Sequence, residues 1–324
     1  MVRAAKDYPE VTFVAMTGDF AAICGVENLH NAFTDVYEAR YVSGVIAGMK
    51  LKELIDAGKI DATLNMKDGN YKIGYVGAFP YAEVVSGYTA FYLGIKSVVS
   101  NVIMDVVFTS SWFDEEREAA GAEYLMAAGC VIIGQHADST GAPSAIQAKH
   151  DAGQYTNVFC VGYNVDMIDD AEDAILTSPT NNWEVYYTML FNNVLEGKDV
   201  PTDWSEGYAQ DAVGLTKLNE KTIAAGTAER VAEVVAAIKA GTLQVFDTSK
   251  FTVGGQTLTS SKVNLSYMDF TATPPTVVYE GAEVEAITTV GGITYFAESV
   301  ERAAPYFSLA IDGITQNDVD LSAQ

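Results

Sequence analysis

The chain has 324 residues, of which 49% are hydrophobic, so it can form two ordinary domains with a substantial buried core in each. Its 43 acidic and 19 basic residues give a formal net charge of −24, which would repel a polyphosphate backbone and excludes nucleic acid as an expected partner. No apolar run is long enough to span a bilayer, and the first residues lack a secretory signal or lipobox, so we expect the chain as given to be soluble.

The first fifth of the chain predicts one strand followed by a long helix. Residues 11–16 form a short, apolar, β-branched run that leads into a Thr-Gly-Asp turn, which is typical of a buried strand entering a loop. Residues 34–57 carry apolar side chains near helical spacing, with small residues such as Gly44 and Gly48 between them. We expect this helix to pack closely against a sheet. The polar, turn-rich residues 58–70 then separate this unit from the next.

Strand-like and helix-like segments alternate regularly between residues 72 and 162. The predicted strands are residues 72–77, 102–109, 130–134 and 158–162, and the predicted helices between them are residues 82–97, 115–128 and 140–152. Alternation at this spacing predicts a parallel sheet covered by helices on both faces.

The remainder of the chain changes in character at about residue 241. Before it, residues 174–177 predict a strand, and residues 183–195 and 220–240 predict helices. After it, the segments are rich in Thr, Val and Gly and include a Gly-Gly turn within residues 251–258, which predicts a small β appendage.

Candidate functional side chains follow the predicted strands, because a doubly wound sheet binds its ligand outside the carboxyl ends of its strands. Aromatic rings alternate there with carboxylates and amides. The candidate ligand contacts are Asp19, Phe20, Phe79, Trp112, His136, Asp138, Tyr163, Asn164, Asp166 and Trp183. This mixture suits a flat polar heterocycle, whose faces stack on rings and whose edge nitrogens bond to carboxylates and amides, although a sugar would also fit. The alternative for any one ring is that it packs at the rim of the site without touching a ligand. In the same way, Asp114 could serve only to cap the helix that follows it.

Metal-binding and enzymatic motifs are absent from the sequence. His136 and Asp138 could form half of a metal or acid/base site, but the chain has only three histidines and no Cys-x-x-Cys pair. Cys130 and Cys160 lie in apolar runs and are expected to be plain buried residues. No nucleophile elbow, Walker loop or dinucleotide-binding glycine motif follows a strand. We therefore expect neither a metal nor a cofactor.

Several colinear motifs resemble the basic membrane protein family of ABC-transporter lipoproteins, which is also called purine-nucleoside-receptor-like. They are residues 28–48, KIGYVGAFP (72–80), GYTAF (87–91), SWFD (111–114), QHADS (135–139), GYNVDM (162–167) and NW (182–183). The resemblance covers roughly residues 1–240, and a colinear series is far more specific than any single motif.

The resemblance implies an α/β fold of the periplasmic-binding-protein type, in which two doubly wound lobes hold a ligand in the cleft between them. The implied parts are a partial first lobe (1–70), a second lobe (71–180), a crossover and return to the first lobe (181–243) and a C-terminal extension (244–324). Closure about a hinge would trap the ligand without turnover, and an ABC permease would read the closed form. Family members bind purine nucleosides or bases, Asp138 and Asp166 fall where such contacts are expected, and we expect a monomer.

The chain departs from the family pattern in two places. Nucleoside-binding members carry a lysine shortly after the Thr-Ser that ends the last strand of the second lobe, whereas residues 177–183 read TSPTNNW, which favours a nucleobase such as adenine. Members also have a lipoprotein signal and about three strand-helix units before the segment equivalent to residues 7–10. We therefore expect a first lobe truncated at its N-terminus, and a full-length protein that is periplasmic or lipid-anchored outside the cytoplasm.

Other interpretations remain open from the sequence. The chain could be a sensory ligand-binding module that reports to a kinase, or a nucleoside or glycoside hydrolase in which Asp138 and Asp166 act as an acid/base pair. The C-terminal extension, with Phe246 and Phe307 in its most apolar motifs, resembles an extension of some bacterial members. It could be a lid, a partner surface or an interlobe brace, and we expect a brace.

Overall fold

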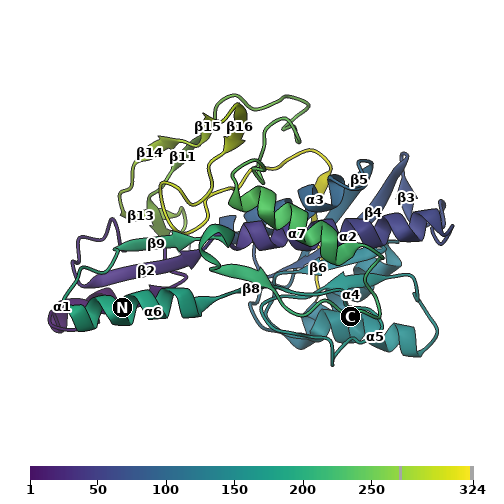
Figure 1. Ribbon diagram of the computed structural model, residues 1–324, viewed down its shortest axis with the longest axis horizontal. Coiled ribbons are helices and arrows are strands. Elements are labelled where there is room, and N and C mark those ends of the chain that lie inside the picture. Colours follow the sequence, from purple (N-terminus) through teal and green to yellow (C-terminus); the bar gives the residue numbers. More distant parts are fainter. Residues whose placement is uncertain (270–271, 322–324) are drawn as a thin grey trace.

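Two parallel sheets organise the chain, and helices and a β-rich extension pack around them (Figure 1). The computed structural model describes residues 1–269 and 272–321. None of the helices in these two ranges combines the length and the low polarity needed to cross a membrane. The predicted α/β class with parallel sheets is confirmed.

The first sheet has three parallel strands, with α6 (Trp183–Glu196) lying beneath it (Figure 1) and the short α1 (Val2–Asp7) packing against the residues around β1 and β2. Its strands, in spatial order, are β1 (Phe13–Met16), β2 (Leu29–Thr34) and β9 (Asp203–Glu206). The sequence analysis predicted β1 but not the other two. All six residues of β2 are buried although its sequence is LHNAFT, because the amide of Asn31 is used inside the sheet: it accepts from Ala21 N and donates to the Asp203 carboxylate.

The second sheet is larger and is also parallel along its main path. Its spatial order is β17 (Ile314–Asn317), β5 (Val102–Phe108), β4 (Asn70–Gly77), β6 (Ile132–Gln135) and β7 (Phe159–Val161), with β3 (Met66–Lys67) antiparallel to β4. Four of these strands match the predicted alternation. The fifth, β17, comes from the far C-terminus and pairs Ile314 with Met104 at the edge of the sheet, which no local pattern predicted.

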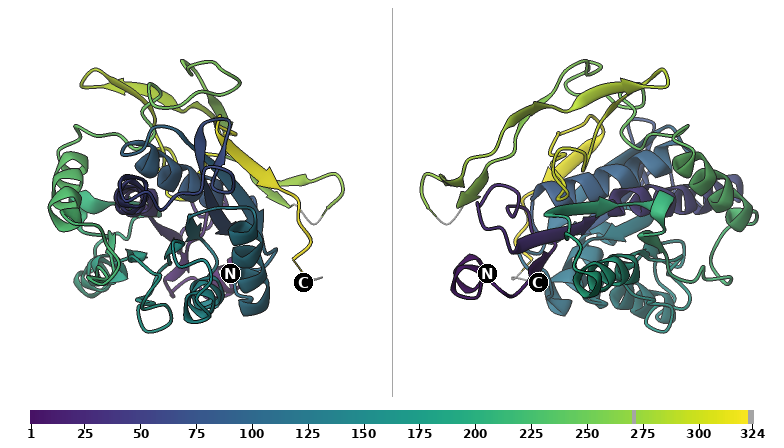
Figure 2. Two further views of the ribbon diagram at one scale, coloured as in Figure 1. Left: turned by 90° about the vertical axis from the view of Figure 1, so that its right-hand side faces the viewer. Right: turned by 60° about the vertical axis from the view of Figure 1, so that its left-hand side comes forward.

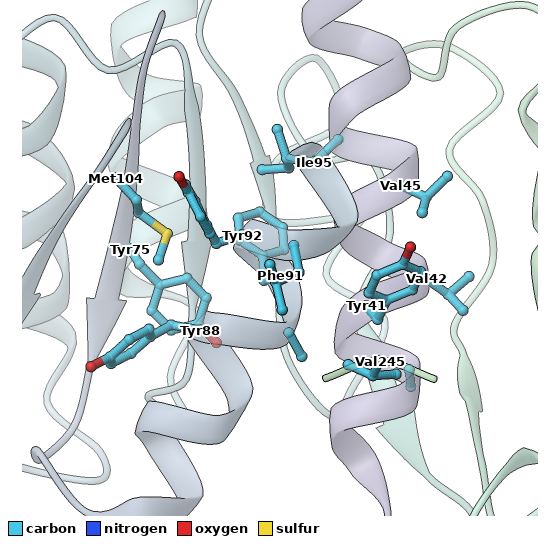
Figure 3. Close-up of a cluster of buried hydrophobic side chains, with 14 of the residues drawn as sticks. Tyr41, Val42, Val45, Tyr75, Tyr88, Phe91, Tyr92, Ile95, Met104 and Val245 are labelled. Carbon is cyan, nitrogen blue, oxygen red and sulfur yellow. The ribbon is translucent and has the colours of Figure 1, made fainter. Parts of the chain in front are cut away.

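Helices cover both faces of the second sheet, as predicted. α2 (Val36–Asp56) and α3 (Ala82–Lys96) lie on one face, and α4 (Glu115–Ala127) and α5 (Gly141–Asp151) lie on the other. In the core of the first face, Tyr75 and Met104 of the strands meet Tyr88, Phe91 and Tyr92 of α3, and the side chains of α2 pack behind them (Figure 3).

The small residues of α2 serve a contact different from the expected one. A Cβ added at Gly44 would lie 2.2 Å from the carbonyl oxygen of Phe91, and one added at Gly94 would lie 2.2 Å from that of Tyr41. The backbones of α2 and α3 therefore touch, so these small residues lie against a neighbouring helix, while α2 itself packs on one face of the second sheet as expected. Glycine is required here because no side chain fits between the two helices.

Short segments connect the two sheets and return the chain between them. The strand β8 (Pro179–Asn181) pairs antiparallel with β10 (Val213–Leu215), and a single 3-10 turn (Tyr208–Gln210) follows β9. The helix α7 (Thr227–Lys239) then packs against α2. It starts seven residues later than predicted, because residues 220–226 form turns after Asn219.

The predicted C-terminal β appendage is confirmed and forms three antiparallel pairs. They are β11 (Lys262–Asn264) with β14 (Glu283–Glu285), β12 (Tyr267–Asp269) with β13 (Thr276–Tyr279), and β15 (Ile287–Val290) with β16 (Ile293–Phe296). Figure 2 shows the extension lying over one side of the molecule and ending beside the second sheet. It also touches the first sheet, since Ala303 N donates to the Asp203 carboxylate over 2.9 Å.

Three carboxyl groups, one buried and two half-buried, lie where the chain passes from the first sheet into α2. Glu38 accepts a hydrogen bond from Tyr208 N over 2.7 Å, and Glu298 of the extension accepts one from Phe307 N over 2.8 Å. Burial outweighs these hydrogen bonds and raises the pKa of Asp35 to about 6, that of Glu38 to about 7 and that of Glu298 to about 8.

These raised pKa values predict that the protein loses stability as the pH rises from about 5 to about 8. A carboxyl whose pKa is higher in the folded state binds its proton more tightly there, so each group costs up to about 1.4 kcal/mol per pH unit within its window. Urea unfolding at pH 5.5 and 8.0 measures the slope. Glu298→Gln, which stays neutral, should reduce it, and an unchanged slope in this variant would contradict the assignment.

Candidate functional site

At the carboxyl ends of β4 and β6, the order in which the chain adds strands to the second sheet reverses. The chain runs from β4 through α3 to β5 on one side, and then through α4 to β6 on the other side of β4. Such a topological switch point leaves a crevice between the loops of neighbouring strands, which is where open α/β sheets bind ligands.

Five rings lie side by side at these strand ends and are called here the aromatic wall: Phe79, Tyr81, Trp112, His136 and Tyr163. Phe79 and Tyr81 are stacked with centroids 5.0 Å apart, and Phe79 lies 5.6 Å from Trp112. Trp112 lies 6.4 Å from the ring of His136, which lies 4.9 Å from that of Tyr163. The rings come from the loops after four different strands, so the structure brings together four sequence-predicted residues and adds Tyr81.

A buried arginine supports the aromatic wall from within. Arg40 of α2 is 1% exposed, and its guanidinium carbon lies 3.9 Å from the centre of the Tyr163 ring. It donates hydrogen bonds to Tyr75 Oη over 2.7 Å and to the carbonyl oxygen of Gln135 over 2.5 Å. Arg40 was not predicted because it does not follow a strand, although it is the one charge in the stretch 39–49 of the predicted helix, and this was a usable signal.

Two carboxyl groups lie at the aromatic wall, and one of them was not predicted. Glu83, in the first turn of α3, has its Oε1 3.5 Å from His136 Nε2, and its side chain is 22% exposed. Burial raises the pKa of Glu83 to about 7, while the charge of Arg40 opposes the rise. Asp138 is exposed, yet the partial desolvation of its carboxyl raises its pKa, and the nearby Glu83 adds to this. Burial lowers the pKa of His136, so its ring is neutral at pH 7.

Two further candidates after β7, Asn164 and Asp166, are exposed. Asn164 has a positive φ of 67°, and its side-chain oxygen accepts a hydrogen bond from Asn181 Nδ2 over 2.9 Å. Asp166 is exposed and accepts one from Ile168 N over 3.0 Å, which closes a local turn. Asn181 also bonds to Thr34 at the end of β2, so Asn164 lies where the two sheets are connected.

The remaining candidates lie on the first sheet. Phe20 stacks on the extension, with ring centroids 4.7 Å from Tyr267 and 5.6 Å from Tyr279. Trp183 begins α6 and packs into the apolar cluster beneath the first sheet. Burial raises the pKa of Asp19, partly offset by Arg302 of the extension. Within the described part of the chain, no ring contact connects Phe20 or Trp183 with the aromatic wall.

The arrangement suits binding by stacking and edge hydrogen bonds. Two cavities, of about 660 and 530 Å³, lie elsewhere, one beside α2 and α7 and one along α6, and their linings include none of the residues of the aromatic wall.

Residues 1–269 and 272–321 contain no group of three His, Cys, Asp or Glu side chains placed to hold a metal ion. Cys130 and Cys160 are buried, and burial raises the pKa of both thiols.

Comparisons with known proteins identify relatives along most of the chain. The family described as ABC transporter substrate-binding protein PnrA-like matches residues 1–248. A purine-binding protein of Brucella abortus is 34% identical over 246 residues, which are 76% of this chain and 61% of that protein. A Haloferax volcanii protein, provisionally named as an ABC transporter glucose-binding protein, is 32% identical over 61% of this chain and 43% of its own length. The chain thus spans about half the length of these curated relatives.

Solved structures share the fold at low sequence identity. A solute-binding protein of an Aeropyrum pernix ABC transporter system has a TM-score of 0.62 at 16% identity, covering 76% of this chain and 73% of that one. A solute-binding protein from Conexibacter woesei has a TM-score of 0.53 at 18% identity, covering 75% and 74%. The fold is therefore that of solute-binding proteins. Because the family match extends over residues 1–248, the chain belongs to the PnrA-like, or basic membrane protein, family of ABC transporter substrate-binding proteins.

Proposed function

We propose that the protein is the extracytoplasmic substrate-binding component of an ABC uptake transporter and that it binds a purine-type ligand without changing it. The aromatic wall is the observation that carries this proposal, because adjacent rings edged by carboxyl groups fit a flat heterocycle with polar edges. The partner is an ABC permease that reads the ligand-bound form of a monomer. The name of the Brucella relative, a purine-binding protein, supports the ligand class.

The ligand is a nucleobase such as adenine rather than a nucleoside. This finer proposal is supported by the segment from Thr177 to Trp183, which offers no lysine to a ribose. A sugar is the second candidate, because the Haloferax relative carries a glucose-binding name. The described wall favours the purine: its groups are mostly rings, whereas a sugar needs a polar partner for each of several hydroxyl groups.

Hydrolysis by Asp138 and Asp166 has less support than binding. The Asp166 carboxylate is exposed and bonds to its own loop at Ile168 N, whereas a catalytic pair needs both carboxyl groups at one reacting bond. A sensory role would use the same fold and the same binding site. The gene neighbourhood separates the two roles: neighbouring permease and ATPase genes support uptake, and an adjacent kinase gene alone supports sensing.

Replacement of Trp112 by alanine should weaken adenine binding about 5- to 150-fold. Stacking of a base on an aromatic side chain contributes about 1–3 kcal/mol, and Trp112 lies between Phe79 and His136 in the wall. Isothermal titration calorimetry measures the change. Tyr187→Ala removes a ring that is 40% exposed on α6, outside the wall, and should leave the affinity unchanged. Equal affinities of the Trp112 variant and the wild type would contradict stacking of the ligand on Trp112.

A thermal-shift series tests the ligand class. Only a ligand that binds the folded state raises the unfolding midpoint, so we expect adenine, hypoxanthine or guanine at about 1 mM to raise it more than adenosine, inosine, guanosine, ribose or glucose. A rise with nucleosides alone would overturn the preference for a base. A rise with sugars alone would replace the purine class by the second candidate.

A further inference from the structure

Glu83, in the first turn of α3, carries a half-buried carboxyl group beside His136 of the aromatic wall. Within the described residues its oxygens make no hydrogen bond, and no lysine or arginine nitrogen lies within 4 Å of them. His136 Nε2 lies 3.5 Å from Glu83 Oε1, a contact that does not amount to a hydrogen bond. Glu83 is half-buried and its oxygens are not among the fully buried atoms that lack a partner, so water reaches the carboxyl, and a ligand bound at the wall would replace that water.

The surroundings of Glu83 point to a ligand as its missing partner. Both ring nitrogens of His136 are also buried without a hydrogen-bond partner in the described residues, and this ring belongs to the aromatic wall. The Nδ1 side of the ring is closed by Gly87, where an added Cβ would lie 2.7 Å from that atom. Glu83 therefore stands on the Nε2 side of His136, at the edge of the rings on which a flat ligand would stack.

Partial burial of Glu83 favours its protonated form, and the charge of Arg40 opposes this from beyond ion-pair contact. Arg40 Nη1 is engaged with Tyr75 and Gln135, and its guanidinium lies over the Tyr163 ring. Asp138, in the loop after β6, adds negative charge nearby, while His136 in the same loop is neutral. A bound ligand would exclude the remaining water and disfavour the charged carboxylate further.

We propose that Glu83 recognises the edge of the bound purine, where its uncharged carboxyl donates a hydrogen bond to a ring nitrogen and accepts one from the neighbouring amine. A protonated carboxyl places a donor beside an acceptor. Adenine carries the matching pair, a ring nitrogen that accepts beside an exocyclic amine that donates. Glu83 is thus a specificity-determining contact for adenine-type edges, an inference that rests on the proposed function.

The affinity for adenine should then depend on pH with a defined sign. Ligand binds the protonated form, so the affinity is constant well below pH 7 and falls as Glu83 ionises, with its pKa of about 7 in the free protein. Between pH 6.0 and 8.5 the affinity of the wild type should fall about ten- to thirtyfold. Adenine keeps one charge state over this range, so the change reports the protein.

Calorimetric titration of three variants of this chain tests the proposal. Glu83→Gln keeps a donor beside an acceptor, so it should bind adenine within about threefold of the wild type at pH 6.0 and lose the pH dependence. Glu83→Ala should bind about ten- to hundredfold more weakly, because both hydrogen bonds are lost. Glu116→Gln, on the exposed side of α4, is the matched control and should behave as wild type.

A second ligand separates recognition from a structural effect. Unsubstituted purine lacks the amine, so it should bind the wild type more weakly than adenine does, and this difference should vanish in Glu83→Ala. Wild-type affinity in Glu83→Ala, or an unchanged pH profile in Glu83→Gln, would overturn the role of Glu83 alone. Failure of the wild type to bind any purine would instead overturn the proposed function.

Discussion

Gly94→Val should lower the free energy of unfolding by about 3 kcal/mol or more. The added Cβ would lie 2.2 Å from the carbonyl oxygen of Tyr41 and 2.9 Å from the Cα of Gly44, both on the backbone of α2. Backbone atoms cannot rotate aside as a flexible side chain can, so α2 and α3 would have to separate and open the core that they share.

Gly214→Val is the matched control for this variant. An added Cβ at Gly214 in β10 meets nothing within 4 Å, and the residue lies in a strand, where valine is favourable. We expect its urea midpoint to stay close to that of the wild type. Similar midpoints for the two variants would show that the contact between α2 and α3 is looser than described.

Phe307→Ala should cost about 3–5 kcal/mol, the usual range for a fully buried phenylalanine. Phe307 is inaccessible to solvent, stacks on Phe246 with centroids 4.3 Å apart and lies 4.8 Å from Phe296. Phe246 in turn lies 5.3 Å from Tyr37 in the first turn of α2. These rings anchor the extension next to the segment that connects the two sheets.

Limited proteolysis together with urea unfolding measures this effect. In Phe307→Ala we expect cleavage within the extension at protease concentrations that leave the wild type intact, because the loosened segment opens locally. Phe191→Ala removes a ring that is 60% exposed on α6 and should change stability by no more than about 0.5 kcal/mol. Equal protease resistance of Phe307→Ala and the wild type would contradict the anchoring role.

Local patterns predicted the second sheet well because each strand and helix there follows its own periodicity. Residues 72–77 are an apolar run and fold as β4, and residues 82–97 have helical spacing and fold as α3. β2 was missed because polar His30 and Asn31 are buried by partners distant in sequence, such as Pro201 and Asp203. Such pairings arise only in the assembled sheet.

The same distinction explains which site residues were found. The rule that ligands lie after strands identified Phe79, Trp112, His136 and Tyr163, which meet in the wall. It could not identify Arg40, because Arg40 reaches the wall from a helix that follows the first sheet. Glu83 was predicted as part of a helix, and the proximity of its carboxyl to His136 depends on how α3 packs beside β6.

The most direct test of the central claim is a calorimetric titration of the wild-type chain with adenine and with glucose at pH 6.0, followed by chromatography of the mixture. The account predicts saturable binding of one adenine per chain, no comparable binding of glucose, and recovery of unchanged adenine. Saturation by glucose without any heat from adenine would contradict the purine assignment. With adenosine added in place of adenine, the release of free base would contradict binding without turnover.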